Sequence, residues 1–213
     1  MREVFQQSLR EVQERLVEIA ELVEGAIDKA TDAFGTSNVA LAEEVIDGAD
    51  RIEELTAALD QLTIDILARQ QPVASDLRLV VGALRMGASL ERMADLAQHI
   101  AQLARYRYPE SAIPKGLKKI FVRMGALDVE MAAKTAELLR TQDAAVIDEI
   151  RDLDDDLDEL HAKVFEKVLS ERLAENPTGV VDATLASRYH ERFGDHAVSV
   201  AKQMQFFLSG SID

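Results

Sequence analysis

The stretch Leu90-Glu91-Arg92-Met93-Ala94-Asp95-Leu96-Ala97 occurs a second time in this sequence, as His190-Glu191-Arg192-Phe193-Gly194-Asp195-His196-Ala197. Another repeated segment precedes each copy, since Asp50-Arg51-Ile52-Glu53-Glu54-Leu55 matches Asp155-Asp156-Leu157-Asp158-Glu159-Leu160 in residue class. Both matches follow the same order along the chain. Because two separate segments repeat in order, we expect two tandem copies of one ancestral unit.

The chain is poor in residues that form turns. Its 213 residues include 10 Gly, 4 Pro and no Trp, while 47% are hydrophobic. Between the few breaks, apolar residues recur with the period of an α-helix. One such stripe consists of Leu41, Val45, Ile52, Leu55, Leu59, Leu62 and Ile66. The sequence therefore predicts an all-α protein with six long helices.

Prolines and small polar residues set the expected helix ends. We expect helices over about 3–34, 38–69, 76–105, 115–140, 143–174 and 177–208. Gly35 would end the first helix by adopting a left-handed conformation, and Ser37 or Asn38 would cap the second. Ser75 or Asp76 would cap the third.

The segment 106–116 contains Pro109 and Pro114 and lies between the two repeats. We place a domain boundary in this segment, with one bundle at 1–108 and the other at 109–213. Short connections make consecutive helices neighbours. The expected architecture is two tandem, structurally similar, antiparallel three-helix bundles.

The charge of the chain limits its partners. With 39 acidic and 24 basic residues, the net charge is −15, which repels nucleic acid and anionic membranes. The absence of cysteine excludes disulfides, thiolate nucleophiles and sulfur ligands for metals. No apolar run approaches the length of a membrane span, and residues 1–10 carry charges where a signal peptide needs apolar residues. We expect a cytoplasmic protein that does not insert into membranes.

Helical phase places the repeated acidic residues away from the apolar stripes, because each residue advances about 100° around a helix. The residues concerned are Glu91, Asp95, Glu191 and Asp195, with Asp50 and Glu53 on the preceding helix. Carboxylates from facing helices supply the oxygen ligands that Mg²⁺, Mn²⁺ or iron accept, with Zn²⁺ less favoured. The alternative is a solvated helix face with ion pairs to Arg92 and Arg192. The residues alone leave both interpretations open.

The remaining motifs do not indicate an enzyme. The four histidines have no counterparts in the other repeat, so we do not expect them in a shared site, although His196 beside Asp195 is kept as an auxiliary ligand. Gly82 and Gly87 have the spacing of a phosphate-binding loop, but the Lys-Ser/Thr that completes that motif is missing. The sequence contains no recognisable Ser-His-Asp arrangement, and surface carboxylates alone define no reaction.

The repeated motif resembles that of the PhoU family of phosphate-uptake regulators, in which each of two three-helix bundles carries a Glu/Asp-x-x-x-Asp motif. This sequence matches through 90–95 and 191–196. The stretch 68–78, Ala-Arg-Gln-Gln-Pro-Val-Ala-Ser-Asp-Leu-Arg, is similar to the family's signature between its second and third helices. The resemblance covers essentially the whole chain.

This resemblance implies a cytoplasmic, often dimeric adaptor that represses the phosphate-starvation response when phosphate is plentiful. The implied partners are the ATPase subunit of the phosphate ABC importer and a sensor histidine kinase. It also implies bound divalent or multinuclear metal, such as iron, zinc, manganese or magnesium. The implied ligands are Glu91, Asp95, Glu191 and Asp195, and then Asp50, Glu53, Asp155 and Asp158. The alternative function is a metal-binding bundle with a storage or buffering role.

Overall fold

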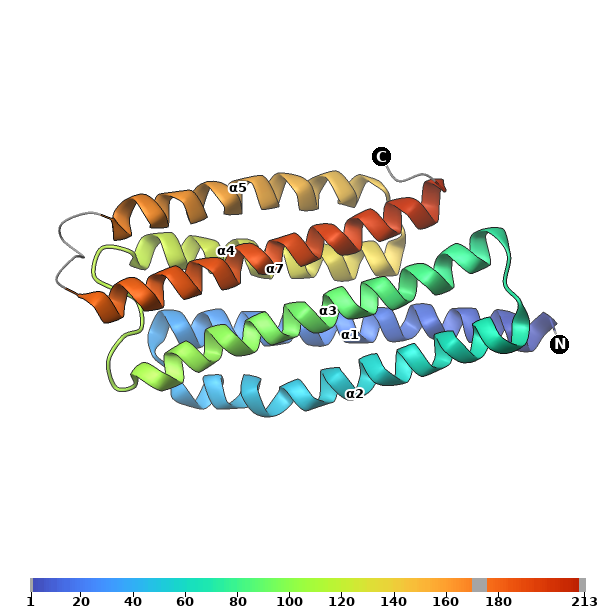
Figure 1. Cartoon of the computed structure of the whole chain (residues 1–213), viewed down its shortest axis with the longest axis horizontal. Coiled ribbons are helices and arrows are strands. Elements are labelled where there is room, and N and C mark those ends of the chain that lie inside the picture. The colour runs from blue at the N-terminus through green and yellow to red at the C-terminus, as the bar shows by residue number, and fades with distance from the viewer. Residues whose placement is uncertain (1, 170–175, 211–213) are drawn as a thin grey trace.

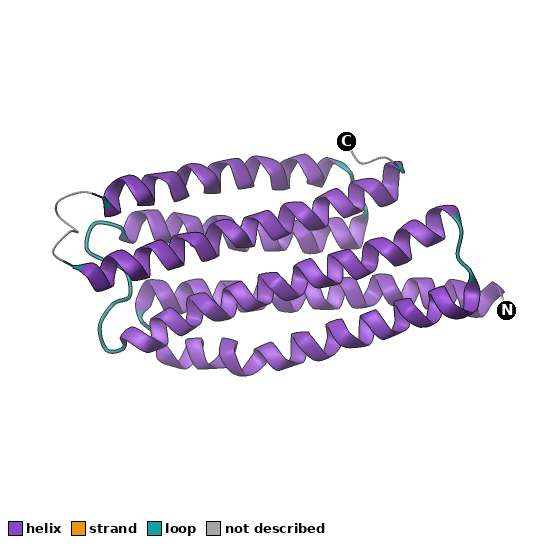
Figure 2. Ribbon diagram, in the orientation of Figure 1, coloured by secondary structure: helices purple, strands orange, loops and turns teal. Residues whose placement is uncertain are grey.

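Helices account for nearly all of residues 2–169 and 176–210, which the computed structural model describes (Figure 1). They are α1 (Arg2–Thr36), α2 (Val39–Gln70), α3 (Ala74–Arg107), α4 (Lys118–Thr141), α5 (Ala145–Val168) and α7 (Pro177–Ser209). No strand occurs in these residues (Figure 2). The prediction of an all-α chain with six helices is confirmed. None of the helices in the described ranges combines the length and apolarity that a membrane span needs.

The six helices form two three-helix bundles that pack side by side in two layers. Helices α2, α3, α7 and α5 make one layer, because α3 contacts both α2 and α7, and α7 contacts α5. Helices α1 and α4 contact each other and lie behind that layer (Figure 1). The predicted two-bundle architecture is confirmed. The exact domain boundary at 108/109 stays a prediction.

The first helix ends differently from the prediction. Gly35 remains helical, and Ser37 is the residue that takes the left-handed conformation, with φ of 59°. Asn38 then caps α2, because its side-chain oxygen accepts a hydrogen bond from the Leu41 amide at 3.3 Å. This cap was one of the two expected.

The start of α3 also corrects the prediction. The helix begins at Ala74 with Val73 in the capping position, and neither Ser75 nor Asp76 caps it. Ala74 has a φ of 50°, and the amides of Asp76 and Leu77 donate to the Val73 carbonyl at 3.1 and 3.4 Å. Backbone hydrogen bonds thus replace the side-chain cap.

In the second bundle, α4 and α5 are shorter than expected. Helix α4 starts at Lys118 rather than 115, because Gly116 takes a φ of 95° and Leu117 donates to the Pro114 carbonyl in a turn. Helix α5 spans Ala145–Val168 rather than 143–174, and residues 170–174 of that expectation lie outside the described residues. Asn176 caps α7 through the Gly179 amide at 3.0 Å.

The cores of the two bundles follow one pattern. The buried positions of α1 at 16, 19, 20, 23, 27, 30, 33 and 34 recur in α4 at 121, 124, 125, 128, 132, 135, 138 and 139. Fully burying a large apolar side chain contributes about 1.5–3 kcal/mol. Some equivalent positions differ in polarity: Val23 and Leu90 of the first core correspond to the ionisable Asp128 and His190 of the second.

An ion pair ties α3 to α7 at the end of the first bundle. The guanidinium of Arg107 donates two hydrogen bonds to the carboxylate of Asp182, at 2.6 and 2.9 Å. The Asp182 side chain is only 5% exposed. A two-point contact of this kind fixes orientation as well as distance, so it helps to set how the bundles pack.

Candidate functional site

Four predicted acidic residues of the first bundle lie together. Asp50 and Glu53 on α2 and Glu91 and Asp95 on α3 line one cavity of about 270 Å³. We call these four residues the first acidic cluster. Ala49 and Ala94 are also in the lining. The groove between α2 and α3 therefore brings the two repeated segments of the first bundle together, as the sequence indicated.

The charges of the first acidic cluster interact with one another. Burial raises the pKa of Glu91, and the carboxylates of Asp95 and Glu53 raise it further, while Arg92 opposes them. Arg92 donates to Asp95 at 2.7 Å, and both side chains are more than a third exposed. An exposed ion pair contributes little stability. The cluster is a partly compensated, solvent-facing group of negative charges.

The second bundle carries a larger group of carboxylates between α5 and α7. Burial and then the carboxylates of Asp158 and Asp195 raise the pKa of Asp154 to about 7, with Asp155 and Glu191 adding to the effect. We call these five residues the second acidic cluster. Like charges held close together favour protonation of one member. Four of the five were predicted from the sequence.

Asp154 is the member that the sequence analysis missed. It corresponds to Ala49 in the first bundle, where the repeat shows no acid. Gly194 makes room for it, because a Cβ at residue 194 would lie 2.5 Å from the Asp154 carboxylate and 2.8 Å from Leu157. The corresponding residue in the first motif is Ala94. The sequence could have indicated Asp154, because the second repeat has both Gly194 in place of Ala94 and Asp154 in place of Ala49.

Glu191 of the second acidic cluster is largely buried, with 13% of its side chain accessible. Arg188 donates to one carboxylate oxygen. The other oxygen, Oε2, is buried and has no hydrogen-bond partner among the described residues. Burial and the Asp195 carboxylate raise the pKa of Glu191, while Arg188 and His161 lower it. A buried, unpaired carboxylate oxygen is rare in stable proteins and calls for a partner.

His161 sits at the edge of the second acidic cluster. Its Nδ1 and the Ser187 hydroxyl are hydrogen-bonded at 2.7 Å, which fixes the ring against α7. The first bundle has Thr56 at the corresponding position, buried and bonded to its own helix. The second groove is therefore both more acidic and more polar than the first.

The two clusters approach each other where α3 packs on α7. Burial lowers the pKa of His196, and the charges of Arg192 and Arg92 lower it further. The carboxylates of Asp195 and Asp95 have the opposite effect and raise this pKa. These residues come from both copies of the motif. The helices that carry the clusters, α2 and α3 in the first bundle and α5 and α7 in the second, belong to the same layer (Figure 1). The auxiliary role of His196 stays a prediction.

The donor chemistry of both clusters suits a hard cation, but their arrangement does not preform a single-ion site. Carboxylate oxygens are the ligands that Mg²⁺, Mn²⁺ and iron accept. Within residues 2–169 and 176–210, no three His, Asp or Glu side chains stand close enough to hold one ion. A cation would be held only after side chains in a groove turn toward it. The unpaired Glu191 Oε2 offers a first ligand in the second groove.

A duplicated three-helix bundle with a cluster of carboxylates in each copy defines a class of helical scaffold. The PhoU domain model matches residues 16–104 and 121–204, one match in each bundle. Together with the full-length relatives below, this match shows that the chain belongs to the PhoU family.

Relatives match the chain over almost its full length. It is 37% identical to the phosphate-specific transport system accessory protein PhoU homolog 2 of Mycobacterium tuberculosis, over 99% of each chain. It is 36% identical to PhoU homolog 1 of Mycobacterium leprae, over 99% of this chain and 95% of the relative. These sequence matches therefore include both bundles of this chain.

Two solved structures are similar to this one. The crystal structure of PhoU from Pseudomonas aeruginosa superposes with a TM-score of 0.91 at 27% identity, covering 97% of this chain and all of that one. PhoU from Streptococcus pneumoniae superposes with a TM-score of 0.85 at 21% identity, over 98% and 99% of the two chains. The latter similarity supports the fold alone.

Proposed function

We propose that this protein is a regulatory adaptor of phosphate homeostasis that represses phosphate uptake and the phosphate-starvation response when phosphate is plentiful. The observation that carries the proposal is the full-length similarity, at 37% identity, to proteins named phosphate-specific transport system accessory proteins. Both acidic clusters fall inside the residues that the family model matches. The proposal assigns no catalytic reaction.

The proposed partners are the ATPase subunit of the phosphate ABC importer and the sensor histidine kinase that controls the starvation response. The two acidic clusters, on a chain of net charge −15, favour a partner surface with basic residues. Charge complementarity of this kind raises association rates and excludes wrong partners. In this proposal the protein works in the cytoplasm, as a homodimer, where both partners are accessible to it.

The experiment that tests this role is deletion of the gene. Cells that lack the protein should express phosphate-scavenging genes constitutively in high phosphate, and a plasmid copy should restore repression. Normal repression in the deletion strain would exclude the adaptor role. A pull-down from solubilised cell membranes then identifies the bound partner. The adaptor should retain the importer ATPase, the kinase or both.

A second function, metal storage or buffering, is favoured by the buried and unpaired Oε2 of Glu191. A bound cation would neutralise the like charges that raise the pKa values of Glu191 and Asp154. The test is elemental analysis of protein purified without chelators, beside the variant Asp95→Ala/Asp195→Ala. More iron, zinc, manganese or magnesium in the unmutated protein supports this function, and equally little metal in both rules it out.

A further inference from the structure

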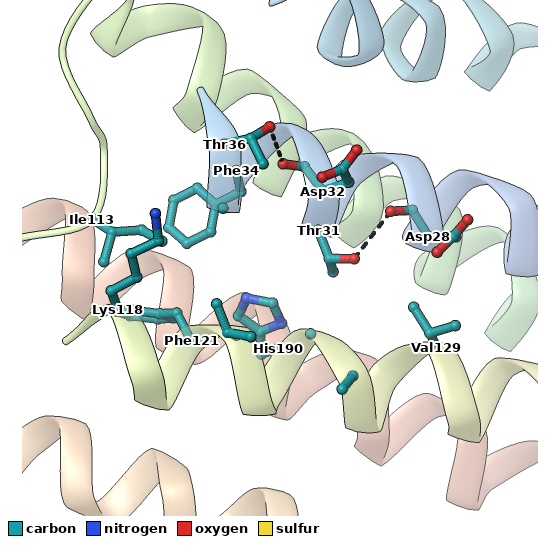
Figure 3. A pocket seen from close by; sticks show the side chains of 14 residues that line it. Asp28, Thr31, Asp32, Phe34, Thr36, Ile113, Lys118, Phe121, Val129 and His190 are labelled. Atoms are coloured by element: carbon teal, nitrogen blue, oxygen red, sulfur yellow. Dashed lines mark hydrogen bonds between the residues drawn. The ribbon is translucent and has the colours of Figure 1, made fainter. Parts of the chain in front are cut away.

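A pocket that shares no residue with either acidic cluster opens between α1 and α4. Its volume is about 550 Å³, within the range of sites that hold small organic molecules. Residues of α1, of the segment before α4 and of α4 form its walls, and His190 of α7 contributes to its floor (Figure 3). None of the residues of the first or second acidic cluster lines it. The proposed function leaves this pocket unused.

The floor of the pocket contains a buried polar pair. Nδ1 of His190 and Oδ2 of Asp128 are 2.5 Å apart, and both residues have no exposed surface. Nε2 of His190 has no hydrogen-bond partner among the described residues. A buried polar atom without a partner costs about 1–3 kcal/mol. A side chain of this kind at a pocket wall indicates a ligand that hydrogen-bonds to it.

Aromatic rings surround His190. The ring centroids of Phe34 and Phe121 are 6.2 and 6.0 Å from that of His190, and the two phenylalanines pack edge to face at 5.4 Å. Ile113 and Val129 add aliphatic surface to the same pocket. These walls favour a flat apolar body. His190 has no exposed surface and Phe34 and Phe121 are each 2% exposed, so a ligand would contact Nε2 only after one of the phenylalanine rings turns aside.

The charged residues of the pocket favour a cation. Asp28 and Asp32 contribute two carboxylates and Lys118 one ammonium group, and none of the three forms an ion pair with another described residue. Figure 3 shows Lys118 beside Ile113 at one end and Asp28 near Val129 at the other, with His190 between them. A positively charged group of a ligand is therefore favoured at the Asp28 end.

From this geometry we infer a second binding site, which takes a small aromatic amine. Its ring lies against Phe34 and Phe121, a polar group at one end hydrogen-bonds to Nε2 of His190, and its ammonium group faces Asp28 and Asp32. Asp128 is a positioning residue, because its contact with Nδ1 orients the His190 ring and leaves Nε2 for the ligand.

Three probes of similar size test each part of this recognition on the full-length protein. Tyramine has the phenol and the ammonium group, 2-phenylethylamine lacks the phenol, and 4-hydroxyphenylacetate replaces the ammonium group by a carboxylate. Binding is followed by the NMR shifts of the Ile113 and Val129 methyl groups. Tyramine should shift both methyl groups in a saturable manner, and each of the other probes should bind about fivefold more weakly.

Two variants locate the site. Ala126→Trp places a large ring at an exposed position of the pocket wall and should abolish the tyramine shifts while the melting temperature stays close to that of the unmutated protein. Asp28→Asn/Asp32→Asn should weaken tyramine binding about fivefold. The control, Glu43→Gln/Asp47→Asn, removes the same charge from exposed positions of α2 outside the pocket and should leave the affinity unchanged.

Three results would overturn the inference. The first is the absence of a saturable methyl shift at tyramine concentrations up to about 10 mM, a dissociation constant that corresponds to about 2.7 kcal/mol of binding. The second is equal affinity for the three probes. The third is unchanged tyramine binding to Ala126→Trp. Because none of these measurements involves phosphate or the acidic grooves, a negative result here leaves the adaptor proposal standing.

Discussion

Where the first bundle places Ala49 and Ala94 between its acidic side chains, the second places Asp154 and Gly194. Both bundles have the same three-helix arrangement, although α4 and α5 are shorter than α1 and α2. The glycine gives up helix propensity, by about 1 kcal/mol relative to alanine, and makes room for a carboxylate whose pKa is raised to about 7. The second groove thus holds more negative charge at a cost in stability.

The same contrast holds in the two cores. The first bundle has the apolar residues Val23 and Leu90 where the second has Asp128 and His190, and all four are buried. A buried ionisable pair stabilises a protein no more than well-packed apolar residues of similar size. The second bundle therefore carries a buried polar pair that folding does not require.

The largest effect is expected from breaking the buried pair. His190→Leu copies the first bundle at one position and leaves Asp128 buried without its partner, so the free energy of unfolding should fall by about 3 kcal/mol. Asp128→Val/His190→Leu copies both positions and should recover to within about 1 kcal/mol of the unmutated protein. Urea unfolding of the three proteins measures these differences. A double variant as unstable as His190→Leu would show that the two cores are not interchangeable.

The next effect concerns the space that Gly194 leaves. Gly194→Ala puts a Cβ 2.5 Å from Asp154 and 2.8 Å from Leu157, so we expect a loss of about 1–2 kcal/mol. In the background of Asp154→Ala, which restores the residue of the first bundle, the loss should be smaller. Unfolding midpoints of the four proteins form a double-mutant cycle. Additive losses would mean that Gly194 does not serve Asp154.

A smaller effect is the pH dependence that Asp154 introduces. Its pKa is raised from 3.8 to about 7 in the folded protein, so the folded state binds a proton more tightly than the unfolded state. Stability from this group is complete below pH 3.8 and is lost as the pH rises to about 7. Asp154→Asn should therefore be more stable than the unmutated protein, by about 1 kcal/mol at pH 8, since the carboxyl is only half-buried.

Thermal unfolding from pH 4 to 8 checks this prediction. The advantage of Asp154→Asn over the unmutated protein should grow between about pH 4 and pH 7 and then level off. Asp50→Asn in the first groove serves as the control, because this exposed residue has the same chemistry without the buried surroundings. A difference that is constant with pH would contradict the raised pKa of Asp154.

The smallest effect is stabilisation by a divalent cation. At a Mn²⁺ concentration equal to its dissociation constant, the gain is about 0.4 kcal/mol. Asp154→Asn/Asp195→Asn and Asp50→Asn/Asp95→Asn remove the same charge from the second and the first groove. The second-groove variant should lose more of the Mn²⁺ effect in thermal unfolding. Equal losses of Mn²⁺ stabilisation in the two variants would contradict the prediction that the second acidic cluster binds the cation more tightly than the first.

Repetition and helical period allowed much of this molecule to be predicted. They indicated the six helices, the two bundles and the outward acids, because the amphipathic pattern depends on local spacing. The predicted stop of α1 at Gly35 and the predicted side-chain cap of α3 were wrong. Ser37 takes the left-handed conformation instead, and Val73 occupies the capping position of α3 without a side-chain hydrogen bond. Asp154 and the pair of Asp128 and His190 were missed, because they depart from the repeat and their role arises from contacts between helices.

The most direct test of the account is repression by groove variants in cells that lack the chromosomal gene. A phosphate-starvation reporter is measured in high phosphate with plasmids encoding the unmutated protein, the second-groove variant Asp154→Asn/Asp195→Asn and the first-groove variant Asp50→Asn/Asp95→Asn. We expect full repression by the unmutated protein, a partial loss of repression with the first-groove variant and a larger loss with the second-groove variant. Full repression by both variants, at equal protein levels, would contradict it.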